Sequence, residues 1–219
     1  MKQLNAAHPE TVQHYAQILL QLSAKKQGRY LLGLTGSPAS GKSTFSAQLV
    51  EHINETVAPG TAIVVPMDGY HYSNETLDEK GLKPLKGIPA TFDASGYVEL
   101  IRMLRNESSK SVFAPLFDRS IEASIENGIE ILPQHRIIVS EGNYLLMNES
   151  PWNELPELFD EIWYIDSSID LLIPRLTARH QAGGRNAEEA LAKMESTDLP
   201  NAKLIESTKS RANRIVVIN

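Results

Sequence analysis

Residues 36–43 have the residue types and spacing of a loop that binds phosphate. They read Gly36-Ser37-Pro38-Ala39-Ser40-Gly41-Lys42-Ser43, which follows the pattern G-x-x-x-x-G-K-[ST], and Thr44 comes next. Glycines let the backbone N–H groups turn inward around an anion, a conformation that other residues resist. In such a loop the lysine reaches the β- and γ-phosphates, and the last hydroxyl is a magnesium ligand. The pattern predicts that residues 36–44 bind a nucleoside triphosphate, with a catalytic Lys42 and with Ser43 on the metal.

Two acidic residues follow later apolar segments. Asp68 comes after residues 62–65, and Glu141 comes after residues 137–139. If both segments are parallel strands that flank the phosphate loop, both carboxylates lie at its edge of the sheet. Phosphoryl transfer needs an acidic or water-mediated magnesium ligand and a base or positioning group for the acceptor hydroxyl. We assign Glu141 to the metal. We assign Asp68 to the acceptor, because we expect Gly69 to turn the backbone sharply and leave the Asp68 carboxylate exposed. The alternative for an acidic residue after a strand is that it forms a turn or caps a helix.

A third group of candidate residues is basic. Arg175 and Arg179 lie four residues apart in a stretch of helical pattern, residues 171–180, and Gly183-Gly184 follows it. Arginine forks stabilise the charge on a transferring phosphoryl group, and a glycine pair makes a hinge. We predict a helical lid over residues 175–186, with Arg175 and Arg179 in catalytic roles. A solvated basic helix face is the alternative.

Apolar segments alternate with helical segments along the chain. Strands are predicted at residues 30–35, 62–65, 137–139, 162–165 and 215–218, and helices at residues 9–26, 44–50, 97–105 and 171–180. Continuous apolar runs between helices are typical of parallel strands that are covered on both faces. Residues 112–132 are expected to form a small antiparallel insert with a turn at Asn127-Gly128. The predicted fold is α/β, a three-layer P-loop NTP hydrolase fold with a parallel five-stranded sheet, in one domain over residues 1–219.

Composition excludes several classes of protein. The net charge of −6 argues against a nucleic-acid partner, whose phosphates favour a basic face. No apolar run approaches the ~20 residues that span a bilayer, and the N-terminus lacks the basic start and apolar core of a secretory signal. The chain has no cysteine, which excludes disulfides and thiolate metal sites and suits a reducing cytosol. We expect a cytoplasmic protein without a membrane partner, and a homodimer is the assembly we consider.

Six motifs occur in the order that is found in one family. They are the phosphate loop, Pro66-Met67-Asp68-Gly69-Tyr70-His71, Gly87-Ile88-Pro89-Ala90-Thr91-Phe92-Asp93, Pro115-Leu116-Phe117-Asp118-Arg119, Ser140-Glu141-Gly142-Asn143-Tyr144-Leu145-Leu146 and Asp198-Leu199-Pro200-Asn201-Ala202. From about residue 10 onward, the chain resembles the uridine kinase/phosphoribulokinase/pantothenate kinase superfamily. Within it, the chain is most similar to a bacterial subgroup of fructose-transport-system or nucleoside-type kinases.

The resemblance implies a kinase that uses ATP and Mg²⁺ and phosphorylates a small-molecule hydroxyl. It implies that Asp68 is the base for that hydroxyl, that Glu141 is the acid on the metal side, and that the lid arginines are Arg175 and Arg179. Substrate contacts are implied for Asp93 and Arg119. The other candidate substrate contacts lie in the matching motifs and are Tyr70, His71, Asn143 and Tyr144.

The acceptor stays open among a sugar, a nucleoside, pantothenate and other small metabolites. His180 stands where uridine kinases carry an acid after the lid arginine, and their aromatic–histidine nucleoside pattern is absent. Pantothenate kinases are longer, with a regulatory N-terminal extension. A transport-coupled or regulatory ATPase is the alternative class, although the sequence has neither a guanine-reading Asn-Lys-x-Asp motif nor a Leu-Ser-Gly-Gly-Gln-like signature. A degenerate nucleotide-binding regulator is not indicated, because the phosphate loop and both acids are intact.

Overall fold

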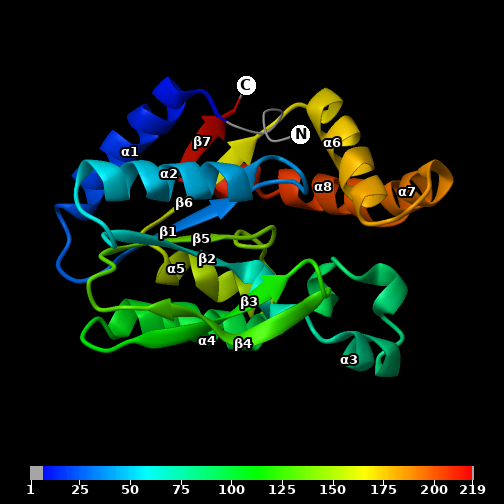
Figure 1. Ribbon diagram of the computed structural model, residues 1–219, viewed down its shortest axis with the longest axis horizontal. Helices are drawn as coiled ribbons and strands as arrows, with labels where there is room; N and C mark the ends of the chain where they lie inside the picture. The colour runs from blue at the N-terminus through cyan, green and yellow to red at the C-terminus, as the bar shows by residue number, and fades with distance from the viewer. Residues whose placement is uncertain (1–6, 219) are drawn as a thin grey trace.

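A five-stranded parallel sheet forms the centre of the molecule (Figure 1). The computed structural model describes residues 7–218. Residues 1–6 and 219 of the predicted single domain lie outside this range, and so does the start of the N-terminus that we compared with a secretory signal. The sheet has the order β2-β5-β1-β6-β7. Its strands are β1 Tyr30–Thr35, β2 Ala62–Pro66, β5 Ile137–Glu141, β6 Glu161–Asp166 and β7 Arg214–Val217. The predicted parallel sheet is confirmed.

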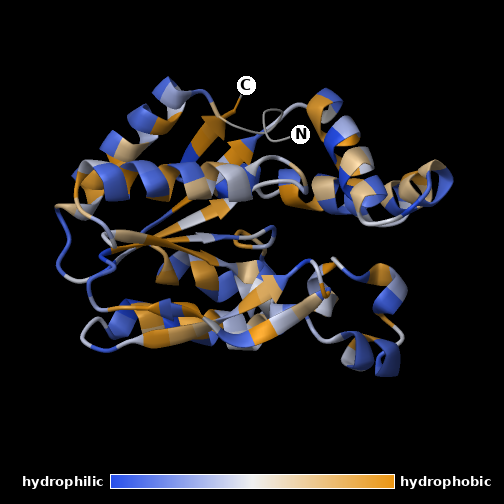
Figure 2. Cartoon of the chain, viewed as in Figure 1, coloured by the Kyte–Doolittle hydropathy of each residue, from blue (hydrophilic) through white to orange (hydrophobic). Residues whose placement is uncertain are grey.

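The central strands are apolar throughout because helices cover both faces of the sheet. Every residue of β1 and of β5 is buried, which explains why neither strand alternates between polar and apolar residues. On one face, α1 Pro9–Ser23 and α2 Lys42–Thr56 pack against Leu32, Leu34 and Trp163. On the other face, α4 Ala94–Asn106 packs against a second core. Figure 2 shows the apolar strands between helices whose outward faces are largely hydrophilic.

The remaining helical segments connect these layers. They are α3 Asn74–Glu79, α5 Leu155–Leu158, α6 Ile169–Ala182, α7 Ala187–Lys193 and α8 Leu199–Glu206, with 3₁₀ turns at Met67–Tyr70, Lys83–Leu85, Pro89–Thr91, Trp152–Glu154 and Lys209–Arg211 and a π-helical turn at Met194–Asp198. All four predicted helices are present; the first ends at Ser23 rather than at residue 26, and α2 extends to Thr56. Over residues 7–218, no helix has the length and apolar character needed to cross a membrane.

The insert is an antiparallel pair, as predicted, but its turn is not at Asn127-Gly128. Strands β3 Val112–Asp118 and β4 Ala123–Ile131 are joined by residues 119–122. Asn127, with φ +54°, lies inside β4, where the register shifts between Ala114 and Leu116. A Cβ on Gly128 would lie 2.6 Å from the Leu116 Cβ, so the chains approach closely there. The Asn-Gly pair forms an irregularity within the strand, because a left-handed residue serves a bulge as well as a turn.

Gly69 is required for packing and not for a sharp turn, which corrects the expected reason for this glycine. It lies in the 3₁₀ turn after β2, and a Cβ there would lie 2.2 Å from the carbonyl oxygen of Pro115 in β3. Any larger residue would push β3 away from the turn. Gly69 therefore lets the hairpin β3–β4 lie directly on the segment that carries Asp68.

The segment predicted as a lid contains the end of α6 and the start of α7. Gly184, with φ +89°, follows α6, and Asn186 caps α7 through a reciprocal capping box with Glu189. His180 of α6 makes a 2.7 Å contact through Nε2 with the Asp198 carboxylate, before α8. This pair joins α6 to the segment that returns toward the sheet.

Candidate active site

The phosphate loop joins the carboxyl end of β1 to the N-terminus of α2. Gly41, with φ +97°, precedes α2, and Ala39 adopts φ +62°, which is uncommon for a residue other than glycine. The Lys42 Nζ donates to the carbonyl oxygens of Gly36 at 2.9 Å and Ser37 at 3.0 Å, so the ammonium lies within the loop. Among the described residues, the buried Ser40 hydroxyl has no hydrogen-bond partner. Both groups suit a bound phosphate, which would supply acceptor oxygens.

Burial lowers the pKa of Lys42. Desolvation lowers the pKa of Lys42 to about 8, and this effect outweighs the attraction of Glu141 and then of Asp68. The positive charges of Arg179 and Arg119 lower the same pKa further. The charges of two carboxylates and two arginines thus act on the loop lysine.

Glu141 lies beside Ser43, as its predicted metal role requires. It ends β5, the strand directly next to β1, and its buried Oε1 accepts a 2.8 Å hydrogen bond from Ser43 Oγ. Desolvation raises the pKa of Glu141, and the negative charge of Asp68 raises it further, against the opposing effect of Lys42. A carboxylate and a hydroxyl in contact beside a phosphate loop are the hard oxygen ligands that Mg²⁺ takes together with phosphate oxygens and water.

Asp68 lies at the same edge of the sheet, although its strand does not flank β1 as expected. β2 lies beyond β5, so both carboxylates lie on one side of the phosphate loop. The Asp68 side chain is 27% exposed, and Oδ2 accepts a 2.9 Å hydrogen bond from the Arg119 guanidinium, which comes from the hairpin turn. The structure thus joins Arg119 and Asp68, which are far apart in the sequence.

Of the two arginines in the predicted lid, Arg175 contacts the phosphate loop directly. Arg175 NH1 lies 3.4 Å from the carbonyl oxygen of Ala39, within the phosphate loop. The charge of Arg179 lowers the pKa of Lys42, and a direct contact of Arg179 with the phosphates stays a prediction. Whether the segment opens and closes remains a prediction.

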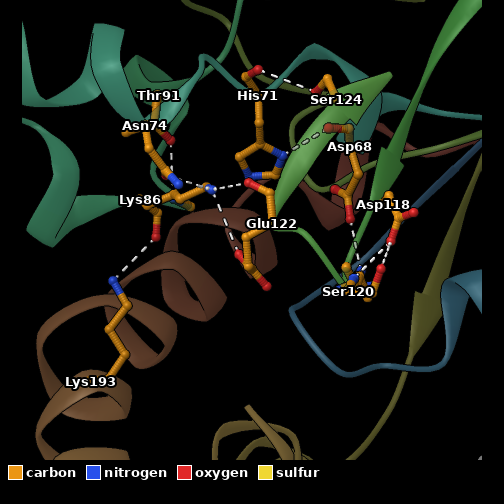
Figure 3. A network of polar contacts seen from close by, with 12 residues as sticks. Asp68, His71, Asn74, Lys86, Thr91, Asp118, Ser120, Glu122, Ser124 and Lys193 are labelled. Carbon is orange, nitrogen blue, oxygen red and sulfur yellow. Dashed lines mark hydrogen bonds and ion pairs between the residues drawn. The ribbon is translucent and has the colours of Figure 1, made fainter. Parts of the chain in front are cut away.

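His71 lies next to Asp68 (Figure 3), and its ring packs against two phenylalanine rings. Its ring lies 3.9 Å from that of Phe92 and 5.0 Å from that of Phe117, measured between centroids. Nδ1 donates to the Asp68 carbonyl at 2.9 Å, which leaves Nε2 as the acceptor when the ring is neutral. Desolvation lowers the pKa of His71 from its ordinary value, against the opposing charge of Asp68, and thereby favours the neutral ring.

Four residues predicted to contact the substrate also have partners within the protein, and their contact with a substrate stays a prediction. Asp93 caps α4 by accepting from the Gly96 N–H, and the fully buried Tyr144 donates its hydroxyl to the carbonyl of Gly87. The backbone carbonyl of Asn143 accepts a 3.0 Å hydrogen bond from the Thr35 hydroxyl. The half-buried Tyr70 packs edge-on against Tyr97, and burial raises its pKa to about 12. Asp93 therefore stabilises the start of α4, and Tyr144 ties the segment after β5 to Gly87.

The sequence patterns did not single out Lys86 and Glu122 as candidate site residues. Lys86 contacts Asn74 and Glu122, which lie 12 and 36 residues away along the chain. No local spacing reveals such a contact, and only the Gly87–Asp93 motif next to Lys86 drew attention to this part of the chain.

The sheet order and the phosphate loop define a P-loop fold. A model of the phosphoribulokinase/uridine kinase family matches residues 31–218. A "putative uridine kinase" from Schizosaccharomyces pombe is 36% identical over 188 residues, covering 83% of this chain and 80% of that protein. An uncharacterized protein, YggC, from Escherichia coli K12 is 33% identical over 193 residues, covering 87% of this chain and 78% of that protein.

One solved structure is similar over almost its whole length. It is a "putative fructose transport system kinase" from Silicibacter sp. TM1040, with a TM-score of 0.84 and 35% identity, and the match covers 93% of this chain and 98% of that one. The chain belongs to the phosphoribulokinase/uridine kinase family. It is an ATP-dependent small-molecule kinase, as the resemblance implied.

Proposed function

We propose that this kinase transfers the γ-phosphoryl group of ATP, with magnesium, to an alcohol group of a small metabolite such as a sugar, a nucleoside or a pantothenate-like acceptor. The observation that carries the proposal is the position of Asp68. Its carboxylate lies at the edge of the sheet that also holds the phosphate loop, and Arg119 contacts it directly. A carboxylate at this place can accept the proton of an acceptor hydroxyl as the oxygen attacks phosphorus.

The nucleotide side would be formed by residues 36–44. Lys42 would interact with the β- and γ-phosphates, and the unpaired Ser40 hydroxyl would donate to a phosphate oxygen. Ser43 and Glu141 would hold magnesium, which when bound neutralises charge on the phosphates. Arg175 and Arg179 would stabilise the charge on the group being transferred.

The acceptor would lie between Asp68 and the hairpin β3–β4. Arg119 and the neutral His71 line this region from two different segments. Arg119 can bind an acceptor oxygen and present it to Asp68, and Nε2 of His71 can accept from a second hydroxyl. The composition also favours a location in the cytoplasm, where ATP is available, and a homodimer remains part of the proposal.

The test is ADP release from Mg-ATP with and without a panel of hydroxylated metabolites. A kinase releases ADP in proportion to the acceptor, whereas a transport-coupled or regulatory ATPase turns over without one. Lys42→Ala is the matched control, and we expect it to fold normally and to lose on the order of 10³-fold in turnover if Lys42 supplies about 4 kcal/mol of transition-state stabilisation. A folded Lys42→Ala protein with near-native turnover would contradict the assignment of the phosphate loop.

A further inference from the structure

Lys86 connects three segments next to Asp68 (Figure 3). Its Nζ donates to Asn74 Oδ1 of α3 at 3.1 Å and to the Glu122 carbonyl at 3.2 Å, and the Glu122 carboxylate lies 3.6 Å away. The side chain is only 18% exposed, and Nζ lies 5.1 Å from the centre of the Phe117 ring. An ammonium group loses hydration when it is buried in this way, so its fixed partners must compensate it. The geometry therefore couples Lys86 firmly to the residue Glu122.

Glu122 ends the turn that carries Arg119. Its backbone has φ +52°, a conformation that is uncommon for residues other than glycine and that persists when contacts hold it. At the start of the turn, Asp118 accepts from the Ser120 N–H at 2.8 Å and from the Ser120 hydroxyl at 2.6 Å. The turn is thus fixed at one end by its own residues and at the other end by Lys86. Arg119 lies between the two ends and is 55% exposed, so the turn determines where its guanidinium reaches.

The backbone around Lys86 is in turn held by the helices that follow the lid. Lys193, at the end of α7, donates to the carbonyl of Pro84 at 2.9 Å and to that of Lys86 at 3.2 Å. Asn201 of α8 donates to the carbonyl of Gly87 at 3.1 Å. Residues 84–87 therefore form a continuous connection between α7 and the hairpin turn.

We propose that Lys86 is a positioning residue that holds the turn 119–122 so that Arg119 meets Asp68, and that Lys193 transmits nucleotide binding at the lid to this turn. This inference rests on the proposed function for the role of Asp68. Nucleotide and acceptor sites would then be coupled through residues 84–87. When the lid engages the phosphates, α7 moves or stiffens, and the turn that faces the acceptor becomes more ordered with it.

The test is hydrogen exchange of the full chain, with and without a non-hydrolysable ATP analogue and magnesium. In the wild type, the analogue should slow exchange in residues 175–186 and also in residues 119–124. Lys86→Met keeps the apolar part of the side chain but removes the donor. It should exchange on the order of tenfold faster in residues 119–124 in the free protein, and nucleotide should no longer protect this turn.

Two variants control for a general loss of structure. Lys86→Arg keeps donors for Asn74 and Glu122 and should restore the protection of the turn. Lys83→Met removes a nearby exposed ammonium, which pairs with Asp78 at 2.5 Å, and should exchange like the wild type. Nucleotide affinity should be unchanged in both.

Three outcomes would overturn the proposal. They are a protected turn in a folded Lys86→Met protein, equal loss of protection in Lys83→Met, and failure of Lys86→Arg to restore it. If Lys86→Met does not fold, Lys193→Met takes its place and must lose the nucleotide-dependent protection of the turn. A wild type that binds no nucleotide would refute the proposed function. In that case, faster exchange of residues 119–124 in the free Lys86→Met protein would still support the positioning role of Lys86, and unchanged exchange would refute it.

Discussion

Lys42 should make nucleotide binding depend on pH in the range 7 to 9. Burial lowers the pKa of Lys42 to about 8, and its ammonium is the form that attracts the phosphates. Below about pH 8 the free protein carries this charge, and it loses the charge as the pH rises through that value. Binding above this pH must therefore take up a proton, so affinity is full below the pKa and falls above it.

The expected change in nucleotide affinity follows from the fraction of Lys42 that is charged at each pH. With a pKa of about 8, roughly 90% of the free protein is charged at pH 7 and roughly 10% at pH 9. If the neutral form binds weakly, the dissociation constant rises about tenfold between these two pH values, or about 1.4 kcal/mol. The triphosphate itself is fully ionised over most of this range, so the change comes from the protein.

Calorimetry with a non-hydrolysable ATP analogue and magnesium measures both the dissociation constant and the number of protons taken up on binding. The dissociation constant is determined at pH 7, 8 and 9 at constant ionic strength, in two buffers that differ in ionisation enthalpy, and the difference in heat gives the protons taken up. Lys42→Arg keeps its charge over the whole range and should show a flat profile. A flat profile in the wild type, without proton uptake at pH 9, would refute the assignment of Lys42 to the phosphates or the effect of its burial.

Three further predictions concern the base, the hairpin and the lid. Asp68→Asn should still bind ATP while transfer falls by roughly 10²- to 10⁴-fold; a loss of ATP affinity with unchanged transfer at saturation would exchange the roles of Asp68 and Glu141. Gly69→Ala places a Cβ 2.2 Å from the Pro115 carbonyl oxygen and should lower the free energy of unfolding by about 1–3 kcal/mol in urea titration, and a neutral result would mean that β3 moves freely. Residues 175–186 should exchange more slowly with nucleotide and magnesium, and equal protection with and without them would indicate a static helix.

Most helices and strands were predicted correctly because the residue pattern of each one lies within a short stretch of the sequence. The run of apolar residues in β1 and the glycines and lysine after it are contiguous, so no long-range contact was needed to recognise them. The position of Glu141 beside Ser43 also followed, since the carboxyl ends of parallel strands meet at one edge of a sheet. The turn at Asn127-Gly128 was wrong because the same residue pair satisfies a bulge within a strand.

The sequence by itself determined the phosphate loop, the parallel sheet with its helices, and the two acids at the edge of that sheet. The tertiary structure alone decided that β2 lies beyond β5, that Arg119 reaches Asp68 and that Tyr144 is buried in the core. These features depend on how separate elements pack, and residues that lie 51 positions apart, such as Asp68 and Arg119, leave no periodic signal in the chain. Local backbone preference and hydrophobic period specify the elements, whereas side-chain pairing across the site requires the completed fold.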